Sequence, residues 1–270
     1  MPQLEGKTAV ILGAARKGNM GQVIARLFAA EGARVMVAGR NEDVLEELAG
    51  EIGGACALCD ITSHAEVHAL ADKAAAEFGR VDAAINCTGW GLLASLLEIT
   101  PEQLDAIADL QFKGTHHFLQ AFVRVMGDQE PSGGSLIVLS SATTKALLNN
   151  HAAYIASKRA GEAMVECVAN DYGHVGIRAN SVSPALTESP MTEAALATPG
   201  ILEAFLPRYP LGRINTSGDV AQACLWLCSD NAYVTGQNIQ PNGGVTLRGN
   251  PQAVDIQSSV AAAMAAQAEE

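Results

Sequence analysis

The sequence predicts a doubly wound α/β fold, in which one parallel sheet carries helices on both faces. Two observations predict it. Short β-rich runs alternate with amphipathic helical stretches, and these runs are apolar throughout rather than at every second position. Continuous apolar strands separated by helices are typical of a parallel sheet that is covered on both faces. Right-handed crossovers between such strands produce the doubly wound arrangement.

The first strand is expected at Thr8–Leu12, where the run TAVIL is short, apolar and rich in β-formers. A glycine-bearing turn follows, and then an amphipathic helix from about Gly21 to Glu31 that Gly32 ends. The chain shows no linker, repeat or charge block, so residues 1–270 are predicted to form a single Rossmann-fold domain. Further strands are expected at Arg34–Ala38, Ala55–Cys59, Ala83–Cys87, Leu136–Leu139 and Ile177–Val182, and a second helix at Glu42–Ile52.

The amino-acid composition excludes several classes of protein and partner. Of the 270 residues, 49% are hydrophobic and 17% are charged, which excludes a disordered chain. The formal net charge of −12 argues against a nucleic-acid or anionic-membrane partner, because such a surface repels phosphates. The longest uncharged stretch, Asn231–Leu247, is rich in polar residues, so no membrane span is expected. Glu5 and Lys7 precede the first apolar run, so no secretory signal is expected, and we predict a soluble cytoplasmic protein.

The six cysteines are interpreted as free thiols in a reducing compartment. Cys56 and Cys59 lie three apart in an apparent strand, so their side chains point to opposite faces. Cys224 and Cys228 share a helix face with Leu and Trp, which favours burial. No metal site is predicted, because no pair of cysteines is completed by a second pair.

The turn after the first strand indicates a nucleotide site. It reads Gly13-Ala-Ala-Arg-Lys-Gly18-Asn-Met-Gly21, between a strand and a helix. Unpaired N–H groups and the helix dipole make such a turn an anion site, although a merely tight turn is the alternative. Asp60 follows the third strand and is expected to accept a hydrogen bond from an adenine amine. Asn86-Cys-Thr-Gly89 follows the fourth, so all three features lie where doubly wound sheets bind ligands.

The end of the second strand decides the cofactor variant. NAD sites usually carry an acidic residue there for the ribose hydroxyls, whereas this strand ends Ala38-Gly39-Arg40. Arg40, helped by Arg16 or Lys17, is suited to pair with a 2′-phosphate. We therefore favour NADP(H). The alternative is an NAD(H) enzyme in which Arg40 is a solvated cap or stacks on adenine.

Ser141, Tyr154 and Lys158 form the candidate catalytic set. Ser141 ends the fifth strand, and Tyr154-Ile-Ala-Ser-Lys158 opens the next helix. Residues four apart share a helix face, so Lys158 is expected to lower the tyrosine pKa from about 10. Tyr154 then becomes a general acid for carbonyl reduction and a general base for alcohol oxidation. Ser141 is expected to hydrogen-bond the substrate oxygen where charge develops.

These motifs resemble those of the short-chain dehydrogenase/reductase family over about residues 5–245, and further matches are Asn180-Ser-Val-Ser-Pro184 and Thr235-Gly-Gln. The resemblance implies that the tyrosine moves the proton, the serine polarises the carbonyl, and the lysine also binds the nicotinamide ribose. It places the nicotinamide carboxamide just after Pro184, at Thr187. The cofactor residues implied are Gly13, Arg16, Lys17, Gly18, Met20, Gly21, Arg40, Asp60, Ile61, Asn86, Gly89, Tyr154, Lys158, Pro184 and Thr187.

Three departures from the family pattern matter. The glycine turn is about two residues longer than usual and resembles that of the enoyl-reductase branch. That branch spaces its tyrosine and lysine seven apart, so the spacing of four here favours carbonyl and alcohol chemistry. Gln111 occupies the place of an asparagine that supports a proton relay. It is therefore counted with the candidate catalytic residues, and a rearranged water chain is predicted behind Lys158. Ala185 replaces the glycine that commonly follows Pro184.

Residues 186–213 are predicted to form a lid over a largely apolar substrate. The alternative is that the lid's apolar side chains only pack its helices onto the core. His151 and Met191 are the candidate substrate contacts. The resemblance also implies a homotetramer. The tail at 247–270 is expected either to be disordered or to form a helix that helps close a neighbouring subunit's site.

The favoured function is an NAD(P)-dependent oxidoreductase that acts on a small-to-medium ketone or secondary alcohol. The alternatives are an enoyl-type reductase and a nucleotide-binding protein without turnover, for which Gln111 is the only support.

Overall fold

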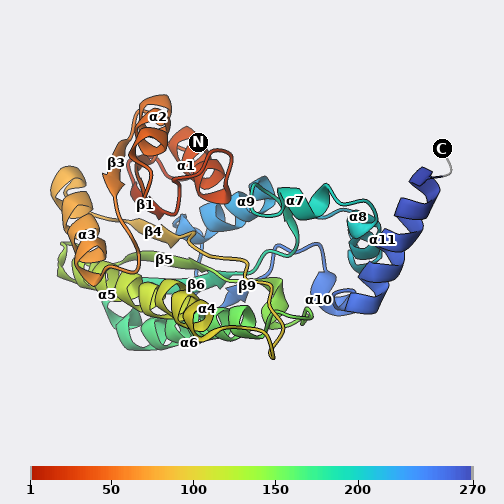
Figure 1. Ribbon diagram of the computed structural model, residues 1–270. Helices are drawn as coiled ribbons and strands as arrows, with labels where there is room; N and C mark the ends of the chain where they lie inside the picture. Colours follow the sequence, from red (N-terminus) through yellow and green to blue (C-terminus); the bar gives the residue numbers. More distant parts are fainter. Residues whose placement is uncertain (1, 269–270) are drawn as a thin grey trace.

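A computed structural model describes residues 2–268 and confirms the predicted fold class (Figure 1). Its central sheet has seven strands in the order β3-β2-β1-β4-β5-β6-β9, and every neighbouring pair is parallel. The chain order reverses between β1 and β4, so their carboxyl ends border the crevice where such sheets bind ligands. The strands are β1 (Thr8–Leu12), β2 (Arg34–Gly39), β3 (Ala55–Leu58), β4 (Ala83–Asn86), β5 (Gly134–Leu139), β6 (Ile177–Val182) and β9 (Asn238–Ile239).

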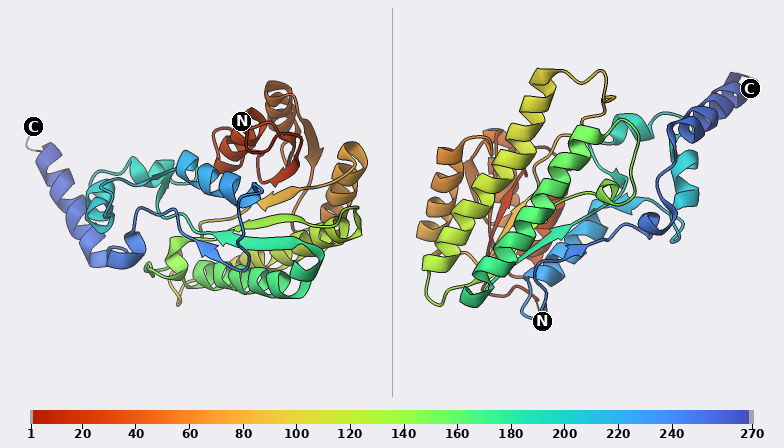
Figure 2. Two further views of the ribbon diagram at one scale, coloured as in Figure 1. Left: turned by 180° about the vertical axis from the view of Figure 1, so that it is seen from behind. Right: turned by 90° about the horizontal axis from the view of Figure 1, so that it is seen from below.

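Helices cover both faces of the sheet, as Figure 2 shows. One face is covered by α1 (Met20–Ala30), α2 (Glu42–Ile52) and α9 (Ser217–Cys228), the other by α3 (His64–Phe78), α5 (Gly114–Asp128) and α6 (Ala152–Tyr172). All five residues of β1 are buried, which explains why this strand is apolar on both of its sides.

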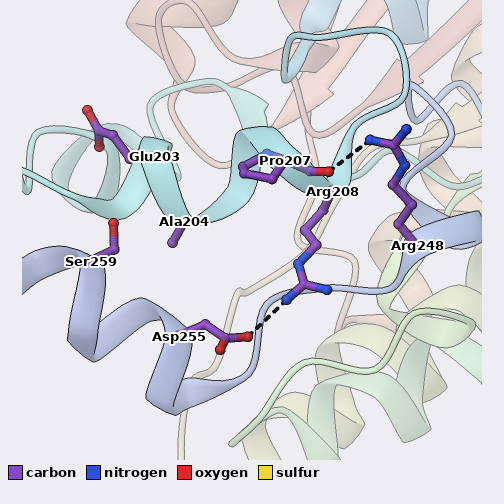
Figure 3. A pocket seen from close by; sticks show the side chains of 7 residues that line it. All are labelled: Glu203, Ala204, Pro207, Arg208, Arg248, Asp255 and Ser259. Carbon is purple, nitrogen blue, oxygen red and sulfur yellow. Dashed lines mark hydrogen bonds and ion pairs between the residues drawn. The ribbon is translucent and has the colours of Figure 1, made fainter.

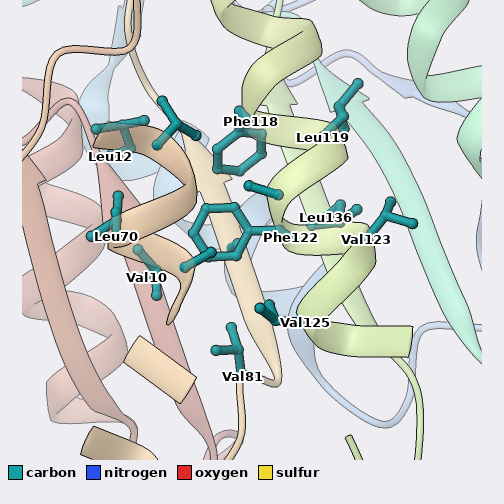
Figure 4. Close-up of a cluster of buried hydrophobic side chains, with 14 of the residues drawn as sticks. Val10, Leu12, Leu70, Val81, Phe118, Leu119, Phe122, Val123, Val125 and Leu136 are labelled. Atoms are coloured by element: carbon teal, nitrogen blue, oxygen red, sulfur yellow. The ribbon is translucent and has the colours of Figure 1, made fainter. Parts of the chain in front are cut away.

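Two phenylalanines dominate the core beneath α5 (Figure 4). Phe118 and Phe122 lie one turn apart on α5 with ring centroids 4.9 Å apart, and both are fully buried against side chains of β1 and β5. Burying a side chain of this size contributes roughly 1.5–3 kcal/mol. This packing fixes α5, and with it the segment in front of α5, against the sheet.

That preceding segment is irregular. α4 (Pro101–Ile107) runs into a π-helical stretch, Ala108–Lys113, before α5 begins. A π-helical turn inside a helix rotates the side chains around it, and such turns are frequent at functional sites. Gln111 lies in this stretch and is buried.

The lid and the tail lie beyond β6. The lid holds β7 (Thr187–Glu188), α7 (Glu193–Leu196) and α8 (Ile201–Phe205). β8 (Asn215–Thr216) follows the lid directly and pairs with β7. α10 (Val245–Arg248) and α11 (Ala253–Ala268) follow β9, and α11 projects from the body of the molecule (Figure 1). No helix within residues 2–268 is long and apolar enough to cross a membrane.

Candidate active site

Two polar side chains hold the long glycine turn in place. Asn19 caps α1 by accepting from Gln22 N–H (3.0 Å), and its Nδ2 donates to Gly13 O (2.8 Å). The buried Gln22 accepts from Gly18 N–H (3.1 Å) and donates to Ala14 O (3.2 Å). The turn is therefore ordered by its own chain. Neither residue was predicted from the sequence, although an Asn at the N-cap position is a recognisable signal.

Gly13 and Gly21 are required by close packing. Gly13 has a φ of 102°, and a Cβ there would lie 2.9 Å from the carbonyl carbon of Cys87. A Cβ on Gly21 would lie 2.7 Å from Gly13 O. The turn after β1 therefore lies directly against the residues that follow β4, and Met20 begins α1 beside it.

Three basic residues lie in or near the glycine turn, and each makes one interaction at the protein surface. Arg16 Nη2 donates to Pro190 O of the lid (2.9 Å), and Lys17 pairs with Glu47 (2.5 Å). Arg40 Nη1 lies 3.6 Å from Asp60 Oδ2, and the Arg40 side chain is 76% exposed. Such exposed pairs are worth at most about 1 kcal/mol, so each cation is available to a phosphate.

Asp60 is held at the end of β3. Its Oδ1 accepts from the N–H (2.9 Å) and the hydroxyl (2.8 Å) of Thr62. Burial raises the pKa of Asp60, but these hydrogen bonds and the charge of Arg40 outweigh that effect, so the pKa lies below its usual value. The carboxylate is an acceptor at neutral pH. Ile61 beside it is buried against α5.

The segment after β4 faces Lys158. Asn86 Oδ1 accepts from the N–H (2.9 Å) and the hydroxyl (2.7 Å) of Thr88, which shapes this turn. A Cβ on Gly89 would lie 3.4 Å from both Lys158 Nζ and Gln111 Oε1. Because Gly89 has no side chain, no Cβ stands between the backbone at this position and the Lys158 ammonium group.

The structure brings Ser141, Tyr154 and Lys158 together at the carboxyl ends of β4 and β5. Lys158 Nζ donates to Leu139 O at the end of β5 (2.8 Å) and lies 5.8 Å from the centre of the Tyr154 ring. Ser141 Oγ accepts from the N–H (3.2 Å) and the hydroxyl (2.9 Å) of Thr143. Both acceptor positions of this hydroxyl are used, so its own proton is left to donate.

The ionisation of this set differs from the sequence-based expectation. Burial lowers the pKa of Lys158 to about 8, against the charges of Cys87 and Glu162. Burial raises the pKa of Tyr154, and hydrogen bonding by Ser141 offsets only part of that rise. The expectation of a lowered Tyr154 pKa is therefore wrong in this structure, because burial disfavours the charged phenolate more than the Ser141 hydrogen bond favours it. Tyr154 is protonated at neutral pH, as a general acid must be.

Gln111 joins two segments behind Lys158. Its Oε1 accepts from Trp90 N–H (2.8 Å), and its Nε2 donates to Ser157 Oγ on α6 (2.7 Å). Its carbonyl oxygen accepts from the Thr115 hydroxyl (2.7 Å). The Gln111 side chain and carbonyl therefore form hydrogen bonds within the protein. We assign Gln111 a role in holding these segments together rather than a direct contact with substrate.

The lid residues divide between a packing cluster and the site. Phe205 and Tyr209 are buried in a cluster of their own with Ile214 and Val245, which agrees with the alternative that they pack the lid. Met191 is 57% exposed and lies against Gly91. The His151 ring meets the Tyr154 ring edge-on, with centroids 5.4 Å apart, and burial lowers the His151 pKa.

Pro184 and Thr187 connect the lid to the serine turn. Pro184 O accepts from Ala142 N–H (2.8 Å), directly after Ser141. Thr187 is buried, and its hydroxyl donates to Ala185 O (2.8 Å). Pro184, which follows the carboxyl end of β6, therefore lies beside the serine turn, and Thr187 follows it by three residues. Within residues 2–268, no group of three His, Cys, Asp or Glu side chains is arranged to hold a metal ion.

A hollow of about 540 Å³ lies between α8 and α11 (Figure 3) and is lined by none of the candidate catalytic residues. Arg208 pairs there with Asp255 of α11 (2.9 Å), and Arg248 donates to Pro207 O (2.9 Å). Gly200 lies so close to α11 that a Cβ would be 2.5 Å from Ser259 O. The tail helix thus packs on the lid of its own chain.

Comparisons with known proteins agree with this fold. The chain matches the family model described as Enoyl-(Acyl carrier protein) reductase over residues 13–246. D-threitol dehydrogenase of Mycolicibacterium smegmatis is 31% identical over 252 residues, which cover 91% of this chain and 95% of that protein. The 3-oxoacyl-(acyl-carrier-protein) reductase of Thermotoga maritima is 32% identical over 251 residues, covering 91% and 100%.

Solved structures agree as well. A gluconate 5-dehydrogenase from Burkholderia cenocepacia in complex with NADP and tartrate is 27% identical, with a TM-score of 0.86, covering 91% of this chain and 97% of that one. A short-chain dehydrogenase/reductase from Mycobacterium ulcerans is 28% identical, with a TM-score of 0.86 and 92% of both chains covered. The doubly wound sheet with its glycine turn has the architecture of a dinucleotide-binding Rossmann fold. The chain belongs to the short-chain dehydrogenase/reductase family of oxidoreductases, which use a nicotinamide cofactor.

Proposed function

We propose that this protein is an NADP(H)-preferring oxidoreductase that interconverts a small-to-medium, largely apolar ketone and its secondary alcohol. The observation that carries the proposal is the convergence of Ser141, Tyr154 and Lys158 beside the glycine turn, with the Lys158 ammonium behind a glycine. The spacing of four between Tyr154 and Lys158 favours carbonyl chemistry over enoyl reduction.

In the proposed mechanism the protein supplies a proton and stabilises charge. A bound nicotinamide cofactor supplies or accepts the hydride. In reduction, Tyr154 donates its phenolic proton to the carbonyl oxygen, and Ser141 donates a hydrogen bond to the same oxygen as negative charge develops. The Lys158 ammonium stabilises the phenolate that remains. His151 and Met191 are proposed to contact the substrate beside Tyr154.

The residues of this chain fit such a cofactor. Glycine at position 89 leaves Lys158 approachable, Asp60 presents an acceptor at the end of β3, and Arg40 presents a cation at the end of β2. Pro184 and Thr187 would lie beside the nicotinamide, and Arg16 and Lys17 beside the phosphates.

We expect a lower KM for NADPH than for NADH, and we expect Arg40→Asp to reverse that order. The substitution removes the phosphate partner and installs a ribose acceptor. It also places a second carboxylate near Asp60, which strengthens the rejection of a 2′-phosphate. The KM ratio of the two cofactors, measured on one preparation, cancels any loss of folded protein. Equal wild-type kinetics with both cofactors would contradict the proposed preference.

The function itself is tested with a panel of ketones and alcohols in the presence of NADPH or NADP. Hydride transfer to a ketone supports the proposal, whereas cofactor binding without transfer to any substrate favours a nucleotide-binding protein. An α,β-unsaturated thioester beside its β-keto counterpart tests enoyl reduction, which the name of the matched family model makes the second candidate. Faster reduction of the unsaturated thioester would replace carbonyl reduction by enoyl reduction.

For assembly and location we propose a cytoplasmic homotetramer. Tyr233 is fully exposed and the Trp226 side chain is 40% exposed, both close in sequence to the edge strand β9. Exposed aromatic side chains of this kind are enriched in protein interfaces. Sedimentation at micromolar concentration is expected to give a tetramer, and a monomer as the sole species would refute this.

Truncation after Arg248 is expected to raise the substrate KM several-fold with cofactor affinity unchanged. Asn250 Nδ2 donates to Ala146 O (2.5 Å) and Ala253 N–H to Asn149 Oδ1 (2.9 Å), so the tail holds the loop that leads to Tyr154. Truncation after Ala265 keeps these contacts and is the matched control. Identical kinetics and thermal stability of both truncations would show that the tail has no part in the site.

A further inference from the structure

Glu162 lies on the same face of α6 as the candidate catalytic residues. It follows Lys158 by four residues and Tyr154 by eight, so the three side chains are one turn apart in succession. Its side chain is half-buried. The catalytic roles assigned above do not use it.

One carboxylate oxygen of Glu162 joins three strand ends. Oε1 accepts from Ser140 Oγ at the end of β5 (2.5 Å) and from Asn238 Nδ2 of β9 (2.5 Å). Ser183 Oγ, just beyond β6, lies 3.4 Å from the same oxygen and accepts from Asn238 Nδ2 (2.9 Å). β5, β6 and β9 are neighbours in the sheet, so this oxygen fixes the spacing between the carboxyl ends of β5 and β6 and the first residue of β9.

The same oxygen also holds the turn that carries Ser141. Thr144 Oγ1 lies 2.9 Å from Glu162 Oε1 and 2.9 Å from Ser141 O, so its single proton is shared between them. Ser140, on the other side of Ser141, donates to Glu162 directly. The serine is therefore flanked on both sides by residues that bind one carboxylate.

An ionised carboxylate suits this position. It offers about four acceptor sites and no donor, and its hydrogen bonds are roughly twice as strong as neutral ones. The other side of Glu162 faces an open hollow of about 490 Å³, where Lys145 and Arg159 also lie. The carboxylate therefore stays hydrated on one side while it organises the serine turn on the other.

We propose that Glu162 is a positioning residue for the reaction: it fixes the Ser140–Thr144 turn, and thereby sets the Ser141 hydroxyl opposite Tyr154. This inference rests on the proposed function. The sequence contains a signal for it, the spacing of four after Lys158, but the partners of Glu162 come from three separate segments.

The test compares Glu162→Ala and Glu162→Gln with Glu166→Ala as the control one turn further along α6. Misplacing a catalytic group by about 1 Å costs up to roughly 100-fold, so we expect Glu162→Ala to lower kcat by about 10- to 100-fold. The cofactor KM should stay within about twofold, because the variant leaves Lys158 and the glycine turn in place. Glu162→Gln keeps the acceptor oxygen, can hydrate its amide nitrogen in the hollow, and should recover most of kcat.

Unchanged kcat in Glu162→Ala overturns the proposal, and so does a Glu162→Gln variant as impaired as Glu162→Ala. Where Glu162→Ala does not fold, Glu162→Asp replaces it: it keeps the charge but withdraws the oxygen from the turn, and it should also lower kcat.

Amide exchange separates this proposal from the proposed function. Ala142 N–H and Thr144 N–H donate to Pro184 O and Ser141 O, and their exchange should be faster in Glu162→Ala or Glu162→Asp than in wild type. Exchange in α9 should not change. A wild-type protein that turns over no substrate refutes the proposed function, whereas unchanged exchange at residues 142–144 refutes the positioning by Glu162.

Discussion

Replacement of Tyr154 by phenylalanine is expected to abolish hydride transfer while cofactor affinity stays within a few-fold. The phenol carries the proton in the proposed mechanism, and general acid–base groups typically contribute about 10²–10⁴-fold. Phenylalanine keeps the ring that His151 meets edge-on, so the site should retain its packing. The measurements are kcat for a ketone of the panel and a fluorescence titration with reduced cofactor.

Tyr172→Phe provides the matched control. Tyr172 ends the same helix and is 41% exposed, far along α6 from Ser141, so its loss should leave kcat unchanged. Retention of more than about a tenth of wild-type kcat by Tyr154→Phe would contradict the assignment of Tyr154 as general acid.

Six of the seven strands of the central sheet were predicted, and two of them, β1 and β4, are buried along their whole length. Thr8–Leu12 is apolar on both sides and was predicted with its observed bounds, since a parallel strand between two helix layers leaves no polar position. β9 was not predicted as a strand. It has two residues, Asn238 and Ile239, and is defined by its pairing with β6, which is distant in the sequence.

The candidate site also has features that the local sequence predicts and features that only the folded structure reveals. Tyr154 and Lys158 were predicted because their spacing on one helix is a local property. The Tyr154 pKa was predicted in the wrong direction, because burial in the folded protein raises it, and the spacing of two residues on a helix does not reveal burial. Glu162 was missed for a related reason, since residues 140, 183 and 238 meet only in the folded sheet.

The tail helix α11 is ordered by its contact with the lid rather than by a strongly amphipathic sequence. Isolated helices shorter than about 12–15 residues are marginal in water even when Ala-rich, so the sequence predicts order only where other protein holds the helix. In the structure the lid provides that contact on both sides of α8, through the close approach at Gly200 before it and the Arg208–Asp255 pair after it. Contact with a neighbouring subunit remains a prediction.

Replacement of Lys158 by methionine is expected to lower both kcat and cofactor affinity. Methionine has a similar length but carries no charge, so it loses the proposed stabilisation of the phenolate together with the proposed contact to the nicotinamide ribose. Hydrogen bonds to charged groups contribute about 1.5–3 kcal/mol, which corresponds to a loss of cofactor affinity of about tenfold or more. Because the α6–β5 contact at Leu139 O is lost as well, thermal stability is measured alongside.

The pH profile of ketone reduction checks the role of the Lys158 charge. With the Lys158 pKa at about 8, the wild-type rate should be constant at lower pH and decline as the pH rises through about 8, where the ammonium loses its proton. Lys158→Arg keeps its charge at every accessible pH, so any activity that it retains should lack this decline. An unchanged decline in Lys158→Arg would assign the titration to another group. Loss of rate alone, or of cofactor affinity alone, in Lys158→Met would show that the lysine serves only one of the two roles.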